Sequence, residues 1–268
     1  MPRSRVAVYT APTDDVLTCY FVKAFRHICD ASYAGEVCWF WNLVELRDEL
    51  ATKQFVWDTI KSIDPILFFG VGHGTEDVFT GFRGDIIFST CNNEVLKNRI
   101  VFLISCLTGV KLGKDMVDKG AIAYLGFKKE YLVPIKVPPK CRDPMRYDEY
   151  AKPVVEPIIK ALSALLSGAP IKIVRRVLID SYNQWIKKLS ESNWSAAPYI
   201  IYALTWNRDA VIAYGDLNAI ATKPVIAPIT IGILAFITSL LDIKATPSSF
   251  IGLIADVYRW RYRAGYGV

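Results

Sequence analysis

Short apolar segments alternate with helical patterns over the first two thirds of this sequence. Residues 65–71 (PILFFGV) and 100–105 (IVFLIS) are apolar at nearly every position, which is typical of strands that helices cover on both faces. Further strand-like segments lie at 5–10 (RVAVYT) and 121–127 (AIAYLGF), with amphipathic helical patterns between them. The alternation predicts βαβ units and therefore an α/β fold with a mainly parallel central sheet flanked by helices.

Further elements are expected along the same domain. They are helices at 14–30, 111–119, 154–168 and 171–191, a helix from the end of the second strand to about 62, a hairpin between 75 and 90, and strands at 36–41, 199–206 and 211–214. Thr13 is expected to cap the first helix, because its hydroxyl can accept a hydrogen bond from a helix N–H. Asp14 and Asp15 suit the positive end of the same helix.

The C-terminal residues depart from this pattern. Residues 225–241 carry no charge over seventeen positions, and an aromatic and basic tail follows at 258–263. A stretch of this length falls at the short edge of a membrane span, which needs ~20 residues. We therefore expect a folded domain at 1–220 and a hydrophobic helical extension at 221–268. Two interpretations of 225–241 stay open: membrane association, and packing as a buried helix or as a contact in a homo-oligomer.

The composition argues against several classes of function. Net charge is +6, but lysines and arginines are spread along the chain, which argues against nucleic-acid binding. Two histidines and six cysteines without a CxxC pair indicate no metal site, and no other cofactor is indicated. A disulfide framework is not expected, because most cysteines lie in apolar segments. The N-terminus lacks the long apolar segment of a signal peptide, so a cytoplasmic location is expected.

His73 and Cys106 each follow one of the two most apolar strands. Because the carboxyl ends of parallel strands meet at one edge of a sheet, we expect both side chains at that edge. A cysteine nucleophile needs a nearby imidazole to move its proton and N–H donors for the oxyanion. The glycines around His73 allow a substrate to approach the backbone closely, so the amides of Gly74 and Cys106 are the candidate donors. The pattern predicts a His–Cys catalytic pair.

Other cysteine chemistries fail on spacing. A Cys-based phosphatase loop needs arginine six residues after the cysteine, where this chain has Leu112. A nucleophile elbow needs glycine two residues before and after the nucleophile, where Ile104 and Thr108 stand. Papain-like enzymes place the cysteine before the histidine, the opposite order. No role is indicated for Cys141. Five further residues are interpreted as packing residues: His27, Cys19, Cys29, Cys38 and Cys91.

The two blocks resemble those of clan CD cysteine peptidases, which include caspases, metacaspases, gingipains, clostripain, separase and the related CHAT domains. That family has a strand ending in His-Gly and, after a hairpin, an apolar strand ending in Ala/Ser-Cys. Here these segments are FFGVGHG and VFLISC. The short helix after the cysteine and the segment GAIAYLG are most similar to the gingipain and CHAT branch. The resemblance covers about residues 5–220 and implies a three-layer caspase-like fold, although Leu217 replaces the proline usual after the late Gly-Asp pair.

The resemblance also implies the roles of the site residues. Cys106 would be the nucleophile that attacks a peptide carbonyl, and His73 the general base and acid. Members of the family commonly cleave after a charged or polar residue that a complementary pocket holds. Asp14 and Asp15 lie where pocket acids would select Lys or Arg. Acids in the first turn of a helix often serve only the helix dipole, so that alternative stays open.

Glu76 and Asp77 follow His73 closely and are candidates to orient its ring or to contact the substrate. Acids in a hairpin are more often solvated, which is the alternative. The loop-rich connection at 128–153 would lie over the sheet edge and contains basic pairs that suit self-cleavage by a basic-specific enzyme. These are Lys128-Lys129 and Lys140-Cys141-Arg142.

Two hypotheses from different classes follow. The first is a cysteine endopeptidase that acts on protein or peptide substrates without a metal or organic cofactor. The second is a non-catalytic caspase-like scaffold that assembles through its apolar tail, in an oligomer or at a membrane. Both predict the same fold, and they differ in whether Cys106 reacts with a substrate carbonyl.

Overall fold

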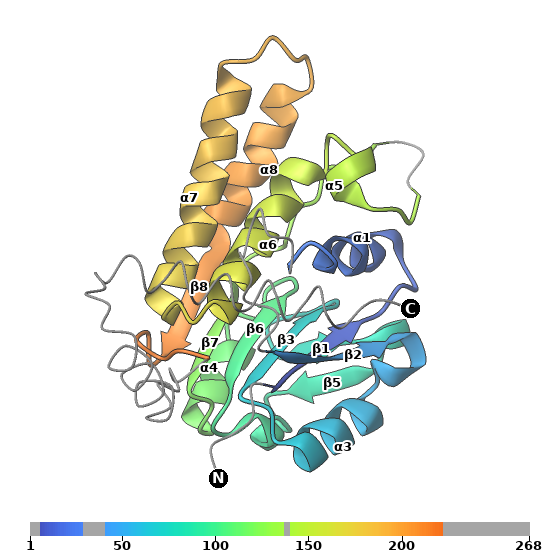
Figure 1. Ribbon diagram of the computed structural model, residues 1–268, viewed down its shortest axis with the longest axis vertical. Helices are drawn as coiled ribbons and strands as arrows, with labels where there is room; N and C mark the ends of the chain where they lie inside the picture. Colours follow the sequence, from blue (N-terminus) through green and yellow to red (C-terminus); the bar gives the residue numbers. More distant parts are fainter. Residues whose placement is uncertain (1–5, 29–40, 137–139, 222–268) are drawn as a thin grey trace, which may run out of the picture. The chain divides into compact units, whose positions relative to one another are not determined.

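The computed structural model describes residues 6–28, 41–136 and 140–221, which belong to one unit spanning residues 1–223. Its centre is a six-stranded sheet in the order β2-β1-β3-β6-β7-β8 (Figure 1). Every neighbouring pair is parallel except β7 and β8, which run antiparallel. The strands are β1 (Val6–Ala11), β2 (Asn42–Arg47), β3 (Leu67–Val71), β6 (Ile100–Ile104), β7 (Ala123–Phe127) and β8 (Val211–Gly215). The mainly parallel sheet expected from the sequence is confirmed.

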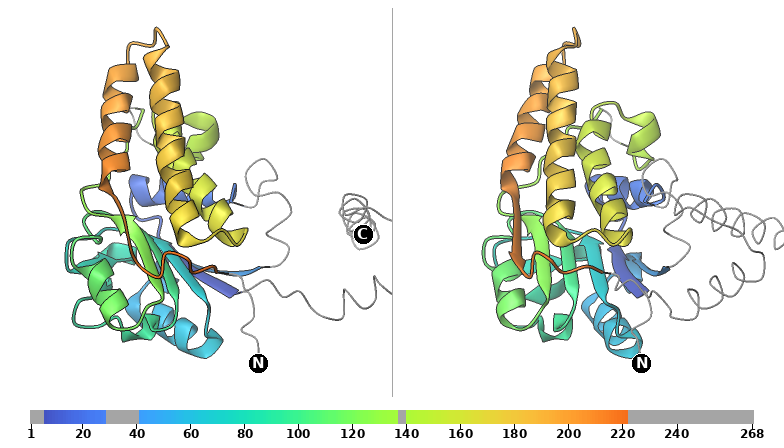
Figure 2. Two further views of the ribbon diagram at one scale, coloured as in Figure 1. Left: turned by 90° about the vertical axis from the view of Figure 1, so that its left-hand side faces the viewer. Right: turned by 60° about the vertical axis from the view of Figure 1, so that its left-hand side comes forward.

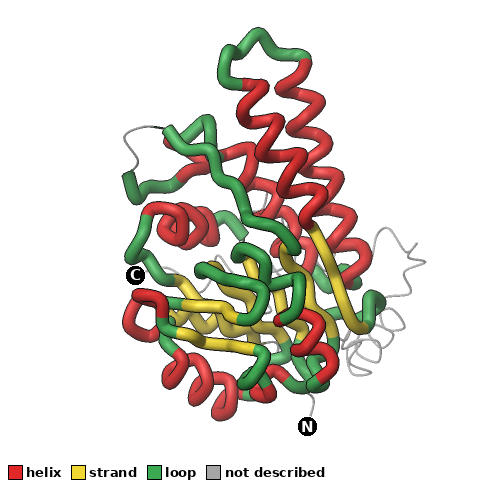
Figure 3. The backbone as a smooth tube through the Cα atoms, turned by 180° about the vertical axis from the view of Figure 1, so that it is seen from behind, coloured by secondary structure: helices red, strands yellow, loops and turns green. Residues whose placement is uncertain are grey.

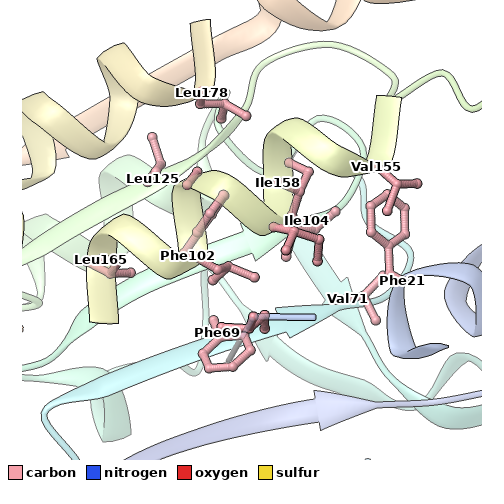
Figure 4. Packing of buried hydrophobic residues seen from close by; sticks show 14 of the residues in the cluster. Phe21, Phe69, Val71, Phe102, Ile104, Leu125, Val155, Ile158, Leu165 and Leu178 are labelled. Carbon is pink, nitrogen blue, oxygen red and sulfur yellow. The ribbon is translucent and has the colours of Figure 1, made fainter. Parts of the chain in front are cut away.

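Helices cover both faces of this sheet (Figure 2). The larger helices are α1 (Val16–Phe25), α3 (Lys53–Ile63), α4 (Leu112–Asp118), α6 (Lys152–Leu166), α7 (Ile171–Ser190) and α8 (Ala197–Ala210). Phe69 and Phe102 pack in one core with α1, α6, α7 and α8, whereas their strand neighbours Phe68 and Val101 pack in a second core with α3 and α4. Figure 4 shows Ile158 of α6 among the side chains of the first core. The two cores explain why these strands are apolar at consecutive positions, and they make the fold three-layered.

Short elements complete the unit. They are the strands β4 (Val78–Thr80) and β5 (Ile86–Ser89), the 3₁₀ helices η2 (Asp48–Leu50), η3 (Phe82–Gly84) and η4 (Glu94–Leu96), and α5 (Pro144–Tyr147). β4 and β5 form the hairpin expected between residues 75 and 90. The hairpin lies close to the end of β3, because a Cβ atom at Gly72 would overlap the carbonyl oxygen of Thr80. This contact explains the glycine before His73.

The strand expected at 199–206 is wrong, since these residues lie in α8. Ile200, Ala203, Leu204 and Asn207 are buried, and their spacing of three and four residues is that of one helix face. Tyr, Ile and Trp favour strands by propensity, but packing against α7 overrides that preference. α7 and α8 form an antiparallel hairpin that extends away from the sheet (Figures 1 and 3).

Two expectations near the N-terminus are also corrected. The second strand is β2, six residues beyond the expected start at 36, in a segment expected to be helical; residues 36–40 lie outside the described ranges. The N-cap of α1 is Asp15 rather than Thr13, because Asp15 accepts hydrogen bonds from the amides of Leu17 and Thr18. Thr13 instead donates hydrogen bonds from its amide and hydroxyl to Asp48, both at 2.7 Å.

A disulfide joins Cys19 of α1 to Cys141 in the connection between β7 and α5. The sequence did not predict this bond, because Cys19 lies in an apolar segment and is fully buried. Cys91 and Cys106 are free thiols. Disulfides persist mainly in oxidising compartments, so the bond bears on the expected cytoplasmic location, which stays a prediction.

Across the described ranges, no helix is both long enough and apolar enough to cross a bilayer. Residues 225–241 lie outside those ranges. Membrane association, homo-oligomer formation and the domain boundary at residue 220 therefore stay predictions.

Candidate active site

The register of β3 and β6 places His73 and Cys106 side by side. Val71 pairs with Ile104 at the carboxyl ends of these strands, and His73 and Cys106 each lie two residues further on. The backbones stay close beyond the strands, since a Cβ atom added at Gly74 would lie 2.7 Å from the carbonyl oxygen of Cys106. The structure thus brings together at one edge of the sheet the two residues that the sequence singled out.

Gly74 is required where it stands. A side chain there would also come within 2.6 Å of Thr108 Cγ2, so any larger residue would push the turn after β6 away from the turn after β3. In the part of the chain that the structure describes, the amides of Gly74 and Cys106 donate no hydrogen bond. Among the described residues, the amide of the candidate nucleophile and that of the neighbouring Gly74 are therefore open to accept a substrate oxygen as partner.

Asp15 holds the ring of His73. His73 Nε2 donates a hydrogen bond to Asp15 Oδ2 at 2.9 Å, and the two residues are 58 positions apart in the chain. Asp15 Oδ1 meanwhile accepts from the amides of Leu17 and Thr18, at 2.8 and 3.0 Å. Because capping of α1 fixes the carboxylate, the carboxylate in turn fixes the orientation of the imidazole.

This pair shifts both ionisation equilibria. The hydrogen bond to Asp15 raises the pKa of His73 above its ordinary value of 6.5, despite the lowering effect of burial. Burial would raise the pKa of Asp15, but the hydrogen bonds from His73 and Thr18 outweigh it and hold that pKa well below its usual value. The imidazolium form of His73 is therefore favoured, and Nδ1 is the ring nitrogen that Asp15 leaves open.

Asp14 lines a cavity, and its charge also contributes to the raised pKa of His73. Its Oδ2 accepts a hydrogen bond from the amide of Arg83 at 2.7 Å. The cavity measures about 500 Å³, and its other lining residues are Thr13, Asp48, Glu49, Phe82 and Arg83. Three carboxylates and one guanidinium give its wall a net negative charge. A larger cavity of about 720 Å³ lies beside the β4–β5 hairpin, and neither His73 nor Cys106 lines either cavity.

Glu76 and Asp77 pair with a different residue from the one expected. Lys111 Nζ lies 2.9 Å from Glu76 Oε2 and 3.4 Å from Asp77 Oδ2. Within the described ranges neither carboxylate hydrogen-bonds to His73, whose carboxylate partner is Asp15. These two acids thus tie the hairpin to the start of α4.

Tyr131 supports the cysteine, and no sequence pattern pointed to it. Its amide donates a hydrogen bond to Cys106 Sγ at 3.3 Å. Its buried hydroxyl lies 2.8 Å from the hydroxyl of Tyr182 and donates to the carbonyl of Val154 at 3.1 Å. A backbone N–H contact of this kind depends on the path of the loop after β7, so residue type could not reveal it.

Hydrogen bonds between buried hydroxyl groups stabilise the turn that carries Cys106. Ser105 Oγ lies 2.8 Å from Thr108 Oγ1, which accepts a hydrogen bond from Tyr124 at 2.9 Å. Leu107, directly after the cysteine, has φ of 58°, a left-handed conformation that costs a non-glycine residue about 1 kcal/mol. Its amide donates to Lys129 O at 3.1 Å. Such strain is characteristic of turns that present a functional side chain.

The described residues contain no group of three His, Cys, Asp or Glu side chains able to hold a metal ion. His27 is buried, and its Nε2 lies 2.9 Å from Asp143 Oδ2, so this histidine connects α1 to the segment before α5. The groups gathered at the carboxyl edge are an imidazole, a thiol, a carboxylate and free amides.

The mainly parallel sheet, its two helical layers and the order of its strands define a caspase-like α/β fold. No family model matches the chain, and no curated protein matches it in sequence. Among solved structures it resembles the complex of the pro- and mature domains of RgpB from Porphyromonas gingivalis, with a TM-score of 0.51 and 13% identity over 81% of this chain and 49% of that chain. It also resembles the Arg-specific cysteine proteinase gingipain R, with a TM-score of 0.48 and 12% identity over 80% of this chain and 47% of that one. The chain spans about half the length of the structures it matches, and likeness at this identity shows the fold alone.

Proposed function

We propose that the protein is a cysteine endopeptidase that hydrolyses peptide bonds with His73 and Cys106. The observation that carries the proposal is the alignment of these residues across β3 and β6, with the ring of His73 bound to Asp15. The RgpB domains that share the fold are named among cysteine proteinases, which supports the same class of reaction.

The groups at the edge supply each step. His73 Nδ1 takes the proton of the Cys106 thiol, and the thiolate attacks the peptide carbonyl. The resulting oxyanion accepts hydrogen bonds from the amides of Gly74 and Cys106. His73 then gives its proton to the leaving amine, which departs and leaves a thioester on Cys106. Water, deprotonated by His73, hydrolyses that thioester and releases the acid and the free thiol.

Asp15 and Tyr131 assist from opposite sides. Asp15 stabilises the imidazolium that forms when His73 takes the thiol proton, which is why a raised pKa of His73 favours the ion pair. The Tyr131 amide donates to Cys106 Sγ and would strengthen that hydrogen bond once the sulfur is charged. Both contacts favour the thiolate–imidazolium pair over the neutral pair.

A preference for cleavage after Lys or Arg is part of the proposal. Asp14, Asp48 and Glu49 line the cavity next to the Asp15–His73 pair, and Phe82 offers an apolar wall for an aliphatic stem. Asp15 itself is occupied by His73 and by the cap of α1, so of the two acids expected to select a basic residue, Asp14 is the one left for that role. Asp14→Asn should lower kcat/KM for arginine reporters more than for glutamine reporters.

An electrophilic peptide probe tests the reaction itself. Acyloxymethyl ketone peptides with arginine or with aspartate next to the warhead are incubated with the protein, and the adduct is located by mass spectrometry. The expected result is labelling at Cys106 that is lost in Cys106→Ala and slowed in His73→Ala. Cys91→Ala is the matched control, because Cys91 is the other free thiol among the described residues and is exposed.

Absence of an adduct at Cys106 in a folded protein under mild reduction would sink the peptidase proposal. The non-catalytic scaffold would then be the reading left, since it requires the same fold and no reactive cysteine. Labelling of Cys91 alone would have the same meaning, because it would show only that an exposed thiol reacts.

A further inference from the structure

A row of aromatic side chains runs along the outer face of α8. Tyr199 and Tyr202 are 61% and 58% exposed, and Trp206 continues the row, with its ring 6.2 Å from that of Tyr202. Spacings of three and four residues place the three rings on one side of a helix. The opposite side of α8 is the one buried against the core, through residues such as Ile200 and Leu204.

The row begins beside the candidate nucleophile. Trp206 Nε1 donates to the carbonyl of Glu130 at 2.8 Å, and Lys129 Nζ lies 4.4 Å from the centre of the Trp206 ring. Lys129 O in turn accepts from the amide of Leu107, the residue after Cys106. Residues 129 and 130 therefore contact both Trp206, at one end of the row, and the residue that follows Cys106.

The sheet places the row at the same edge as the site. Val211, directly after α8, pairs with Phe127 at the carboxyl end of β7, and the amide of Lys128 donates to Ala210 O at 2.9 Å. The C-terminal end of α8 therefore lies at the carboxyl edge of the sheet, and the helix extends away from it (Figures 1 and 3); Cys106 follows β6 at the same edge. A chain bound at the edge can continue along α8 without crossing the domain.

Exposed tyrosines of this kind suit the binding of a polypeptide. Tyr and Trp are enriched in protein interfaces, because they offer large rigid surfaces with a polar tip and lose little conformational freedom on binding. Among the described residues, Tyr199 and Tyr202 belong to neither core and are largely exposed, so burial in a core does not account for them. From Tyr199 to Trp206 the helix rises about 10 Å, which about three residues of extended chain would cover.

We propose that Tyr199, Tyr202 and Trp206 form a docking surface for the substrate polypeptide outside the residues that flank the scissile bond. The occupant is an extended segment of the same chain that is cut at Cys106, with apolar or aromatic side chains packed on the rings. This inference rests on the proposed peptidase function. It makes unfolded or loosely folded proteins better substrates than short peptides.

The test compares short and long substrates in the full chain. The Tyr199→Ala/Tyr202→Ala variant should cut a reporter of four residues at an unchanged rate. For an unfolded protein such as casein, kcat/KM should fall about tenfold, mainly through KM, as for the loss of two interface anchors. Tyr147→Ala is the matched control, since Tyr147 is 59% exposed but lies on α5.

Binding is measured separately from turnover. The Cys106→Ala protein is titrated into fluorescently labelled casein, with and without the two tyrosine changes. Affinity should fall about tenfold when both tyrosines are absent. If the wild type cuts nothing while this binding persists, the peptidase proposal fails, and the row is a surface that binds polypeptides without presenting them for cleavage. Equal affinity with and without the tyrosines overturns the docking surface, whatever the turnover.

Two further outcomes would overturn it. Equal losses on the short and long substrates would show that the tyrosines act on the site rather than on docking. A wild-type dimer that becomes a monomer in the double variant, by light scattering, would show that the row binds a second copy of the chain.

Discussion

The two halves of the candidate site are built differently. On the histidine side, the ring is exposed over 59% of its side-chain surface and is held by one charged hydrogen bond to Asp15. On the cysteine side, Cys106 is half-buried, its sulfur accepts a backbone amide, and Tyr131 and Tyr182 beneath it are joined by hydroxyls. An ionic hydrogen bond therefore fixes the position of His73, whereas packing and backbone contacts fix the position of Cys106. Substitutions should therefore affect activity without stability on one side, and stability before activity on the other.

The disulfide connects the two halves and should give the largest effect. Cys141→Ser opens the bond between α1, which carries Asp15, and the loop that follows Tyr131. Loss of a crosslink across 122 residues should lower the free energy of unfolding by about 4 kcal/mol. Urea unfolding under non-reducing conditions measures it, with Cys91→Ser as the control. An unchanged midpoint would show that contacts such as Tyr20–Asp148, at 2.7 Å, hold these segments together without the bond.

Asp15→Asn separates charge from capping on the histidine side. Asparagine caps a helix about as well as aspartate, so stability measured above the pKa of His73 should hold, while kcat/KM should fall about 10- to 100-fold because the imidazolium loses its partner. Steady-state kinetics and thermal unfolding are measured together. Glu76→Gln removes a nearby carboxylate that pairs with Lys111 instead, and it should change neither.

The Asp15→Ala variant completes that comparison. It should lose activity to the same extent and in addition lose about 1 kcal/mol of stability, because the cap of α1 disappears. Equal stability of Asp15→Ala and Asp15→Asn would contradict the capping role.

Tyr131→Phe probes the cysteine side. The change keeps the amide that donates to Cys106 but leaves the buried hydroxyl of Tyr182 without its partner, which should cost about 1–2 kcal/mol. Activity of the folded protein should stay within about threefold, because the hydroxyl acts only through packing. Tyr147→Phe, at an exposed position, is the control. A large loss of activity at unchanged stability would remove the distinction between the halves.

The smallest expected effect is the titration of His73. Its folded pKa is raised above 6.5, so the stabilising contribution of the Asp15 contact is fully present below pH 6.5 and is lost as pH rises through the folded pKa. NMR should show a pKa above 6.5 in the wild type and a lower one in Asp15→Asn, with His73→Gln used to assign the signal. Because deprotonation of the His73 imidazolium ends activity at high pH, the lower pKa in Asp15→Asn should make that variant lose activity at a lower pH than the wild type. An identical titration in both proteins would mean that Asp15 does not govern the ring.

The sequence predicted the centre of the fold better than its margins. β3 and β6 were predictable because burial on both faces demands apolar residues at every position, and His73 and Cys106 mark where those strands end. The strand predicted at 199–206 was wrong because the aromatic residues of α8 favour strands, whereas the four-residue spacing of the buried Ile200 and Leu204 is that of a helix. β2 was displaced because its polar, partly exposed residues lack the pattern of a core strand.

The site was predictable in its pair and less so in its neighbours. Asp15 was noted as an acid at the carboxyl edge, but its partner lies 58 positions away and only the packing of α1 against the sheet brings them together. The amide of Tyr131 carries no signature in residue type, because every residue except proline has such a group. The bond between Cys19 and Cys141 joins a buried helix to a loop, and spacing alone gives no hint of it.

The disulfide closes residues 19–141 into a covalent ring that contains both His73 and Cys106. A chain cut inside a closed ring stays in one piece. If the bond between Lys128 and Lys129 were cleaved, the two fragments would remain joined through Cys19 and Cys141, and would separate only after reduction. A cut after Arg142 falls outside the ring and would leave two chains with no covalent link, held together only by the packing of α6, α7 and α8 on the sheet. The two basic sites in this loop would therefore yield different molecules on a denaturing gel without reductant: one disulfide-linked product, or two separate chains.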